Sequence, residues 1–305
     1  MAARVTTRTF LEMKARGERI SMLTAYDYPT AKICDLAGVD ALLIGDSLGM
    51  VVQGHDTTLG VTLGEALYHS RMVARAAQHA LVIADMPFLT FQVGAESAIE
   101  NAGRLLAEGG AQAVKLEGGR EMADTVGRLC RVGIPVLGHI GLTPQSVHAL
   151  GGYRVQGRTA ATARRLLDDA LSLEAAGAFG VVLELVPAEV AQAISQRLRI
   201  PTIGIGSGPG CDGQVLVLHD LIGLGEGPGP RHARRYAEVG AAIRDAAGAY
   251  CRDVRAGDYP SAEQSTSLGQ GADAVLAALD GAGTPAPAEP PLGPEFEERP
   301  YGGKL

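Results

Sequence analysis

Four acidic residues each come directly after a short apolar run, and they are the residues best suited to chemistry. They are Asp46, Asp85, Glu117 and Glu184. Carboxylates that gather in one place repel one another unless a cation joins them. Oxygen ligands without a His/Cys cluster are typical of Mg²⁺, which leaves positions for water and for substrate oxygens. The pattern therefore predicts a metal-assisted site for a small, oxygen-rich anion.

Two further residues belong to the same pattern. His139 ends a fifth apolar run, and Lys115 stands two positions before Glu117. Side chains two positions apart in a strand point to the same side, so Lys115 and Glu117 are expected on one face. A lysine buried in a strand needs an anion, because its desolvation is costly. Either a neighbouring carboxylate or a bound ligand could supply it.

A structural explanation competes for some of these acids. An aspartate or serine after a strand is often the cap of the next helix, and Asp46 with Ser47 fits that role. Glutamate is a poorer cap, so Glu117 and Glu184 fit it less well.

The acids must be positioned by strands that alternate with helices. Eight apolar runs have the length of strands, and helix start and stop signals separate most of them. Parallel neighbours need a crossover, so this order predicts a single-domain (β/α)₈ TIM barrel with its site at the carboxyl ends of the strands. An open doubly wound sheet would place a GxGxxG motif after the first strand, and none is present there. The expected strands are Ile20–Ala25, Ala41–Gly45, Leu81–Ala84, Ala113–Leu116, Pro135–His139, Gly180–Leu183, Thr202–Ile205 and Gln214–Leu218.

The barrel is expected to occupy residues 1–260 as the catalytic domain. Within it, Arg231–Arg255 reads as a terminal helix that follows a Gly/Pro loop. Residues 261–305 are rich in proline and glycine, and they predict a disordered C-terminal tail without a core of its own.

Composition excludes several classes of protein. The 305 residues are 46% hydrophobic and 20% charged, with a formal net charge of -7 and dispersed Lys and Arg, which argues against nucleic acid. No apolar run reaches the roughly 20 residues of a membrane span, and the N-terminus lacks a signal sequence. The four cysteines form no CxxC pair, so we expect no zinc site and a reducing cytoplasm.

Two loops are weaker candidates. Gly204–Gln214 resembles a phosphate cradle after a late strand, although glycine loops more often serve as tight turns. His55 and Asp56 could close over a ligand, but the simpler expectation is that they only hold their own loop.

Several segments, taken together and in order, resemble the ketopantoate hydroxymethyltransferase family. They are TAYDYPTAK, IGDSLGMVVQGHDTTLGVT, IADMPF, VKLEGG, GHIGLTPQSVHALGGYRVQGR, LELVP and IGIGSG with CDGQVLVLHD. The likeness runs from about Thr9 to Tyr259, and the combination is specific. It departs around Leu224–His232 and ends near Ser261. The resemblance implies a (β/α)₈ barrel, Mg²⁺ and a homo-oligomer, often a decamer.

The resemblance also implies a role for each matching residue. Asp46 and Asp85 would ligate Mg²⁺ and contact the substrate, and Glu117 would act on the metal through water. Ser47 and Lys115 would hold the substrate carboxylate. Glu184 would be the catalytic base, and His139 would lie near the substrate.

The implied reaction belongs to pantothenate biosynthesis. It transfers a hydroxymethyl group from 5,10-methylenetetrahydrofolate, the co-substrate, to 3-methyl-2-oxobutanoate, giving 2-dehydropantoate and tetrahydrofolate. Two alternatives remain open: a Mg²⁺-dependent lyase of the isocitrate lyase and phosphoenolpyruvate mutase kind, and a barrel that only binds or scaffolds. The first usually carries a catalytic cysteine in a loop, and no cysteine follows Asp85 or Glu117 closely.

Overall fold

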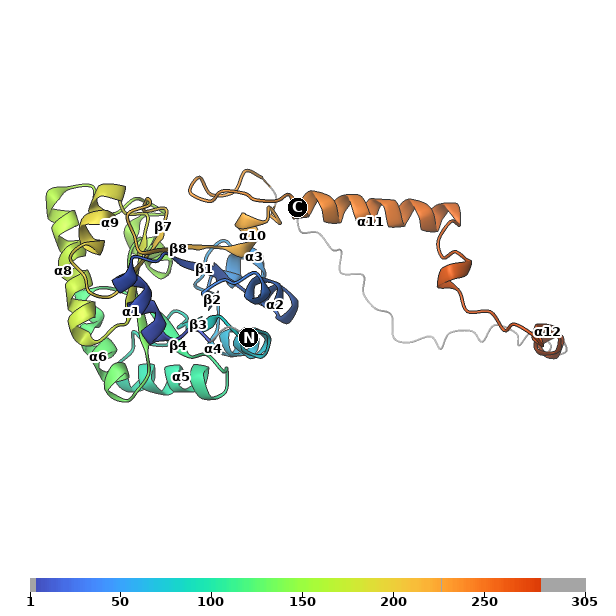
Figure 1. Ribbon diagram of the computed structural model, residues 1–305, viewed down its shortest axis with the longest axis horizontal. Coiled ribbons are helices and arrows are strands. Elements are labelled where there is room, and N and C mark those ends of the chain that lie inside the picture. Colours follow the sequence, from blue (N-terminus) through green and yellow to red (C-terminus); the bar gives the residue numbers. More distant parts are fainter. Residues whose placement is uncertain (1–3, 226, 281–305) are drawn as a thin grey trace, which may run out of the picture. The chain divides into compact units, whose positions relative to one another are not determined.

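Eight parallel strands close into a barrel, and α-helices surround it (Figure 1). The computed structural model describes residues 4–225 and 227–280. The strands pair in sequence order, and β8 closes the ring against β1. The predicted (β/α)₈ barrel is confirmed, and no strand end is shifted by more than two residues from its predicted position. The strands are β1 (Ile20–Thr24), β2 (Ala41–Ile44), β3 (Leu81–Asp85), β4 (Ala113–Glu117), β5 (Val136–Gly141), β6 (Gly180–Glu184), β7 (Thr202–Ile205) and β8 (Gly213–Leu216).

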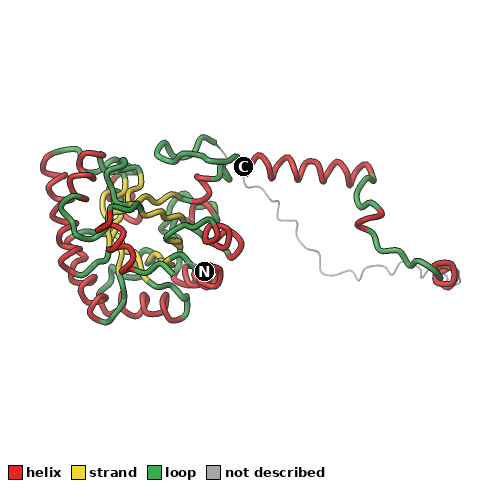
Figure 2. Tube along the Cα trace, viewed as in Figure 1, coloured by secondary structure: helices red, strands yellow, loops and turns green. Residues whose placement is uncertain are grey.

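Helices lie outside the strands and cover them (Figure 2). Local signals set their ends. Thr62 and Glu65 form the predicted capping box at the start of α4, and Gly177 ends α8 in the left-handed conformation. The outer helices are α2 (Tyr28–Leu36), α4 (Leu63–Ala76), α5 (Ala95–Ala107), α6 (Ala123–Arg131), α8 (Ala160–Ala176) and α9 (Ala188–Ser195), and short helices follow three strands: α3 (Leu48–Val51), α7 (Val147–Leu150) and α10 (Leu218–Leu221).

Alternation along each strand divides the apolar residues between two cores. On β2, Leu42 and Ile44 pack outward against the helices, whereas Ala41 and Leu43 pack inside the barrel. Helix α1 (Thr7–Arg16) adds Phe10 to the inner core, where its ring meets Phe179 edge-on at 5.9 Å. The amino-terminal end of the barrel is therefore filled by side chains.

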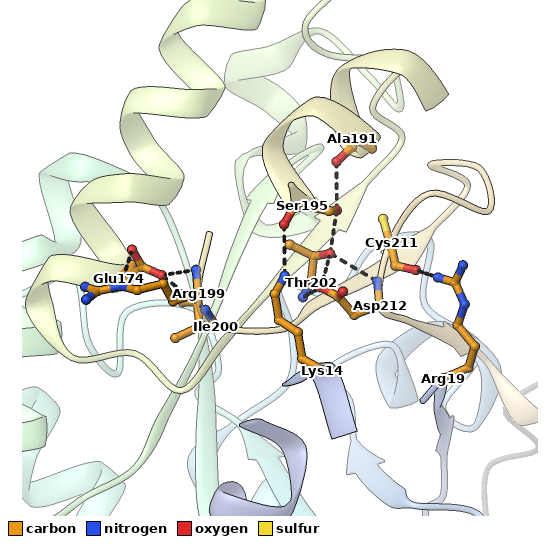
Figure 3. Close-up of polar contacts among 10 residues, drawn as sticks. All are labelled: Lys14, Arg19, Glu174, Ala191, Ser195, Arg199, Ile200, Thr202, Cys211 and Asp212. Atoms are coloured by element: carbon orange, nitrogen blue, oxygen red, sulfur yellow. Dashed lines mark hydrogen bonds and ion pairs between the residues drawn. The ribbon is translucent and has the colours of Figure 1, made fainter. Parts of the chain in front are cut away.

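Polar contacts fix α1 to the last strands (Figure 3). Lys14 Nζ donates to Asp212 Oδ2 at 2.7 Å and to the Ser195 carbonyl oxygen at 2.9 Å. Asp212 Oδ2 also accepts from Thr202 N at 2.8 Å and from Thr202 Oγ1 at 3.0 Å. One carboxylate thus joins α1, β7 and the β7–β8 loop at the end of the barrel opposite the acids.

The segment after β8 corrects one prediction. The terminal helix predicted at Arg231–Arg255 begins eight residues later, as α11 (Val239–Ala256). The reason lies in the backbone, because Tyr236 N donates to Leu221 O at 2.8 Å and Val239 N donates to Ile222 O at 2.9 Å. Both groups bond back to the end of α10 instead of continuing a helix.

The chain divides after Arg244, within α11, into two compact units. In the second unit, η3 (Ala262–Gln264) and α12 (Ala272–Asp280) follow α11. The predicted disorder of residues 261–305 stays a prediction, and 281–305 lie outside the described residues. In the described ranges, no helix has both the length and the apolar character needed to cross a membrane.

Candidate active site

A cavity of about 460 Å³ opens at the carboxyl ends of the strands, and all seven predicted site residues line it. They come from β3, β4, β5 and β6 and from the turn after β2. Parallel strands end at the same face of a barrel, so residues far apart in the sequence meet there. The predicted residues that line the cavity are Asp46, Ser47, Asp85, Lys115, Glu117, His139 and Glu184.

Asp46 and Asp85 lie side by side and are nearly inaccessible to solvent. The backbone N–H of Asp46 donates to Asp85 Oδ2 at 3.0 Å. Burial, reinforced by the charges of Asp85 and Glu117, raises the pKa of the Asp46 carboxyl to about 8. Burial also raises the pKa of Asp85, against the opposing charge of Lys115. The pair is therefore short of positive charge, which is the condition that favours a bound cation.

Lys115 is buried in β4, and the anion that compensates its charge is the carboxylate of Asp85. The strand register places it directly beside Asp85, and its Nζ lies 3.1 Å from Asp85 Oδ1. Burial by itself would lower the pKa of Lys115, but the three carboxylates of Asp85, Glu117 and Asp46 outweigh burial and raise the pKa above its usual value. Of the two anions considered from the sequence, the neighbouring carboxylate is present, and the charged end still lines the cavity.

His139 connects Lys115 to Glu184. Lys115 Nζ lies 3.1 Å from His139 Nδ1, and His139 Nε2 lies 3.1 Å from Glu184 Oε2. Nδ1 also lies 3.6 Å from Glu117 Oε1. Burial and the charge of Lys115 lower the pKa of His139, but the contacts with Glu117 and Glu184 outweigh them and raise it to about 9. Glu184 is less buried than the other acids, with 16% of its side chain exposed. It is thus the carboxylate best placed to meet a molecule entering the cavity.

Ser47 is not the helix cap that its position allowed. It precedes α3 but makes no side-chain capping bond. Its hydroxyl instead shares a 2.8 Å hydrogen bond with the hydroxyl of Tyr26, which is buried. The capping explanation therefore fails for Ser47. Tyr26 lies in the TAYDYPTAK segment, and no local sequence signal predicts its contact with Ser47.

The tight turn before Ser47 depends on Gly45. A Cβ at this position would lie 2.6 Å from Ser47 Oγ and 3.6 Å from Asp85 Oδ2. A larger residue would push apart the groups that the turn brings together.

Gln145 is a site residue that the sequence did not single out. It lies in the short 3₁₀ helix η2 (Pro144–Ser146) after β5, and it is 6% exposed. Its side-chain Nε2 donates to Asp46 Oδ2 at 2.8 Å, and its backbone N donates to Glu117 Oε2 at 2.9 Å. A glutamine in a loop has no local signal for such a role, although Gln145 falls within the GHIGLTPQS segment.

The donor set suits Mg²⁺. Asp85 Oδ1 and Glu117 Oε1 are buried oxygens without a hydrogen-bond partner, although Asp85 Oδ1 lies 3.1 Å from Lys115 Nζ and Glu117 Oε1 lies 3.6 Å from His139 Nδ1. Within residues 4–225 and 227–280, no three His, Cys, Asp or Glu side chains form a complete metal cluster. Mg²⁺ does not need one, because it commonly takes one or two carboxylates and completes its shell with water and substrate oxygens. Asp46 and Asp85 meet that need, with Glu117 beside them.

The two weaker loop candidates give no charged group to the described lining of the cavity, although Ile205 of the glycine segment lines it beside Glu184. In the glycine loop, Ser207 Oγ donates to Leu183 O at 2.8 Å and accepts from Val186 N at 3.0 Å, so the loop braces the end of β6. His55 and Asp56 are exposed and do not contribute to the described lining of the cavity. These contacts favour the structural explanation for both loops.

Comparisons with known proteins agree on a family. The family model of ketopantoate hydroxymethyltransferase matches residues 4–262. A 3-methyl-2-oxobutanoate hydroxymethyltransferase of Chloroflexus aggregans is 57% identical over 87% of this chain and 94% of its own length. One of Pelobacter propionicus is 53% identical over 87% of this chain and 98% of its own length.

Solved structures show a wider likeness of fold. A phosphonopyruvate hydrolase in complex with oxalate and Mg²⁺ has a TM-score of 0.57 at 12% identity, covering 90% of this chain and 98% of its own. A 2,3-dimethylmalate lyase of the phosphoenolpyruvate mutase/isocitrate lyase superfamily has a TM-score of 0.56 at 16% identity, covering 92% of this chain and 100% of its own. At such identities the likeness extends to the fold alone.

Proposed function

The chain belongs to the ketopantoate hydroxymethyltransferase family, and from this premise we propose the reaction that it catalyses. The enzyme transfers a one-carbon unit from 5,10-methylenetetrahydrofolate to 3-methyl-2-oxobutanoate, giving 2-dehydropantoate and tetrahydrofolate and consuming one water. This is an aldol-type step of pantothenate biosynthesis. The observation that carries the proposal is the gathering of Asp46, Asp85, Lys115 and Glu184 around one cavity.

Asp46 and Asp85 would hold Mg²⁺, and Glu117 would act on it through water. When bound, Mg²⁺ supplies Lewis-acid stabilisation of the negative charge that develops on the keto acid. Asp85 Oδ1 and Glu117 Oε1 are buried and accept no hydrogen bond within the described chain, which supports this assignment. Further support is that the phosphonopyruvate hydrolase of the same fold was crystallised with Mg²⁺ and oxalate, a small dicarboxylate.

Lys115 and Ser47 would hold the substrate carboxylate. The Lys115 ammonium is buried, so an anion beside it gains more than it would in water. The Ser47 hydroxyl is kept in place by Tyr26. Two fixed contacts on the carboxylate would orient carbon 3 of the keto acid, and this loss of freedom before reaction is itself a source of rate.

Glu184 would be the general base that takes the proton from carbon 3. His139 Nε2 contacts its Oε2 at 3.1 Å, while Oε1 makes no hydrogen bond within the described chain. His139 would thereby keep the carboxylate turned in one direction. One of the two bonds from the methylene carbon to folate nitrogen opens to give an iminium, and the carbanion forms its bond to that carbon. Water then displaces the second folate nitrogen and provides the hydroxyl oxygen, and both nitrogens leave protonated in tetrahydrofolate.

The test begins with the full reaction. The protein is incubated with 3-methyl-2-oxobutanoate, methylenetetrahydrofolate and Mg²⁺, and 2-dehydropantoate is sought by mass spectrometry. Exchange of the carbon-3 proton in D₂O, followed by NMR without folate, isolates the proton transfer. Glu184→Gln is expected to slow this exchange by about 10²–10⁴-fold while Mg²⁺ and keto acid still bind.

A matched control is Glu189→Gln, an exposed residue in the first turn of α9, which should exchange at the normal rate. Normal exchange in Glu184→Gln would refute the role of Glu184. Absence of the product from the wild-type reaction would refute the proposed function. Cleavage of a 2-hydroxy diacid would favour the lyase alternative instead. A protein that binds neither Mg²⁺ nor the keto acid would favour the scaffold alternative.

We also propose a cytoplasmic homo-oligomer, a decamer by family resemblance. Cys34, Cys130, Cys211 and Cys251 are all free thiols, which suits a reducing compartment. Light scattering coupled to size-exclusion chromatography measures the assembly.

A further inference from the structure

Gln145 joins the ends of three strands through a single side chain and its own backbone. Its Nε2 donates to Asp46 Oδ2 at 2.8 Å and to the Met86 carbonyl oxygen at 3.0 Å. Its backbone N donates to Glu117 Oε2 at 2.9 Å. Asp46 follows β2, Met86 follows β3 and Glu117 ends β4, so Gln145 contacts three neighbouring strand ends from the loop after β5.

A second glutamine fixes which way the Gln145 amide faces. Gln92, in the loop after β3, donates from its Nε2 to Gln145 Oε1 at 2.9 Å. Both hydrogens of Gln145 Nε2 are then committed to Asp46 and to Met86. A flipped amide would turn Oε1 toward two other acceptor oxygens and Nε2 toward the donor of Gln92, and all three contacts would be lost.

Gln145 holds each of the two acids by one oxygen only. It contacts Asp46 Oδ2 and Glu117 Oε2, and it leaves Asp46 Oδ1 and Glu117 Oε1 uncontacted; Glu117 Oε1 lies 3.6 Å from His139 Nδ1. The donors are also neutral. A lysine or arginine in this place would bring a positive charge that competes with a metal ion, whereas a neutral amide fixes a carboxylate and leaves its charge available.

We propose that Gln145 is a positioning residue for the metal site, set in its orientation by Gln92. It turns one oxygen of Asp46 and one of Glu117 away from the cavity, and it thereby presents the other oxygen of each to the cation or to the water around it. This inference rests on the proposed function, since it assigns a role toward the Mg²⁺ proposed above. Partners that orient metal ligands in this way typically contribute about 10–100-fold to metal affinity.

The test measures binding of Mg²⁺ to the metal-free protein by isothermal titration calorimetry. Gln145→Leu keeps the backbone N–H to Glu117 and removes only the amide. It is expected to raise the Kd for Mg²⁺ about 10–100-fold. Carbon-3 exchange should need more Mg²⁺ for half-maximal rate by a similar factor, while the rate at saturating Mg²⁺ and the KM for the keto acid change far less. A variant that is merely less stable would not need more Mg²⁺ for half-maximal rate while keeping its rate at saturating Mg²⁺ and its KM for the keto acid.

Two further variants complete the design. Gln92→Leu touches no acid, so it tests the orientation of the amide even if Gln145→Leu fails to fold, and a weaker effect in the same direction is expected. Gln53→Leu is the matched control, because Gln53 Nε2 also donates to a carboxylate, that of Glu65, at 2.7 Å but away from the acids. Its Kd for Mg²⁺ should equal that of the wild type.

The outcomes separate the inference from the proposed function. Wild-type protein that binds no Mg²⁺ would overturn the metal assignment and the inference with it. Wild-type protein that binds Mg²⁺, with folded Gln145→Leu and Gln92→Leu both within twofold of it, would overturn the inference alone. An equal loss in Gln53→Leu would also overturn it, because the effect would then not depend on the acids.

Discussion

Replacing Lys115 by methionine tests whether this buried ammonium holds the acid cluster together. Methionine keeps most of the volume and removes the charge. Lys115 Nζ and Asp85 Oδ1 are 3.1 Å apart, and each side chain is 5% exposed. Coulomb's law at that distance gives about 5 kcal/mol with an effective dielectric constant of 20. Removing one partner of a buried pair typically costs about 3–5 kcal/mol, because the other charge is left uncompensated.

The pH of the measurement follows from the direction of the Lys115 pKa. Its pKa is raised in the folded protein, so the Lys115 charge contributes its stabilisation fully below the unfolded value of about 10.4 and loses it only as the pH rises through the folded value. A urea titration at pH 7.5 in EDTA therefore measures the protein with Lys115 charged. The free energy of unfolding of Lys115→Met should fall by about 3–5 kcal/mol.

A double-mutant cycle with Asp85→Asn isolates the pair. The uncompensated charge is absent from Lys115→Met/Asp85→Asn, so the double mutant should be less destabilised than the sum of the single mutants. We expect a coupling energy of about 2–3 kcal/mol, near the upper end for residues in contact. If the two losses add to within about 0.5 kcal/mol, the reasoning about this pair is wrong.

Three other changes have expected outcomes. Asp35 accepts from the backbone N–H groups of Gln78, His79 and Ala80, and these hydrogen bonds outweigh burial and lower the pKa of its carboxyl. Asp35→Asn should therefore lower the free energy of unfolding by about 1.5–3 kcal/mol near pH 7. Denaturant titrations should show this loss shrinking as the pH falls below about 4, because the wild-type carboxyl then also becomes neutral. A loss that grew on acidification would contradict this. Gly45→Ala should raise the KM for the keto acid by displacing the Ser47 hydroxyl, and an unchanged KM in the exchange assay would refute the close approach. Lys14→Met should lower the free energy of unfolding by about 1–3 kcal/mol, because it removes the hydrogen bonds to Asp212 and Ser195. The kcat of the folded enzyme should stay unchanged, since these hydrogen bonds lie at the end of the barrel opposite the acids. A lower kcat in fully folded Lys14→Met would contradict this.

The sequence by itself determined the order of the elements and the face on which the acids meet. Each strand is a short apolar run whose ends are marked by helix signals, so its position can be read locally. Parallel strands then bring all their carboxyl ends to one face without further information. Asp46, Asp85, Glu117 and Glu184 could be assigned to a common site for this reason, although they span more than 130 positions.

Only the tertiary structure decided which groups meet within that face. The strand register sets Lys115 beside Asp85. The sequence AVKLE could not show whether the anion beside Lys115 would be a protein carboxylate or a bound ligand. Gln145 reaches Asp46 across 99 positions, from a loop whose path depends on the packing of β5. The late start of α11 has the same origin, since the backbone before it bonds to the end of α10. Periodicity and caps act over a few residues, whereas these contacts arise from the closing of the barrel.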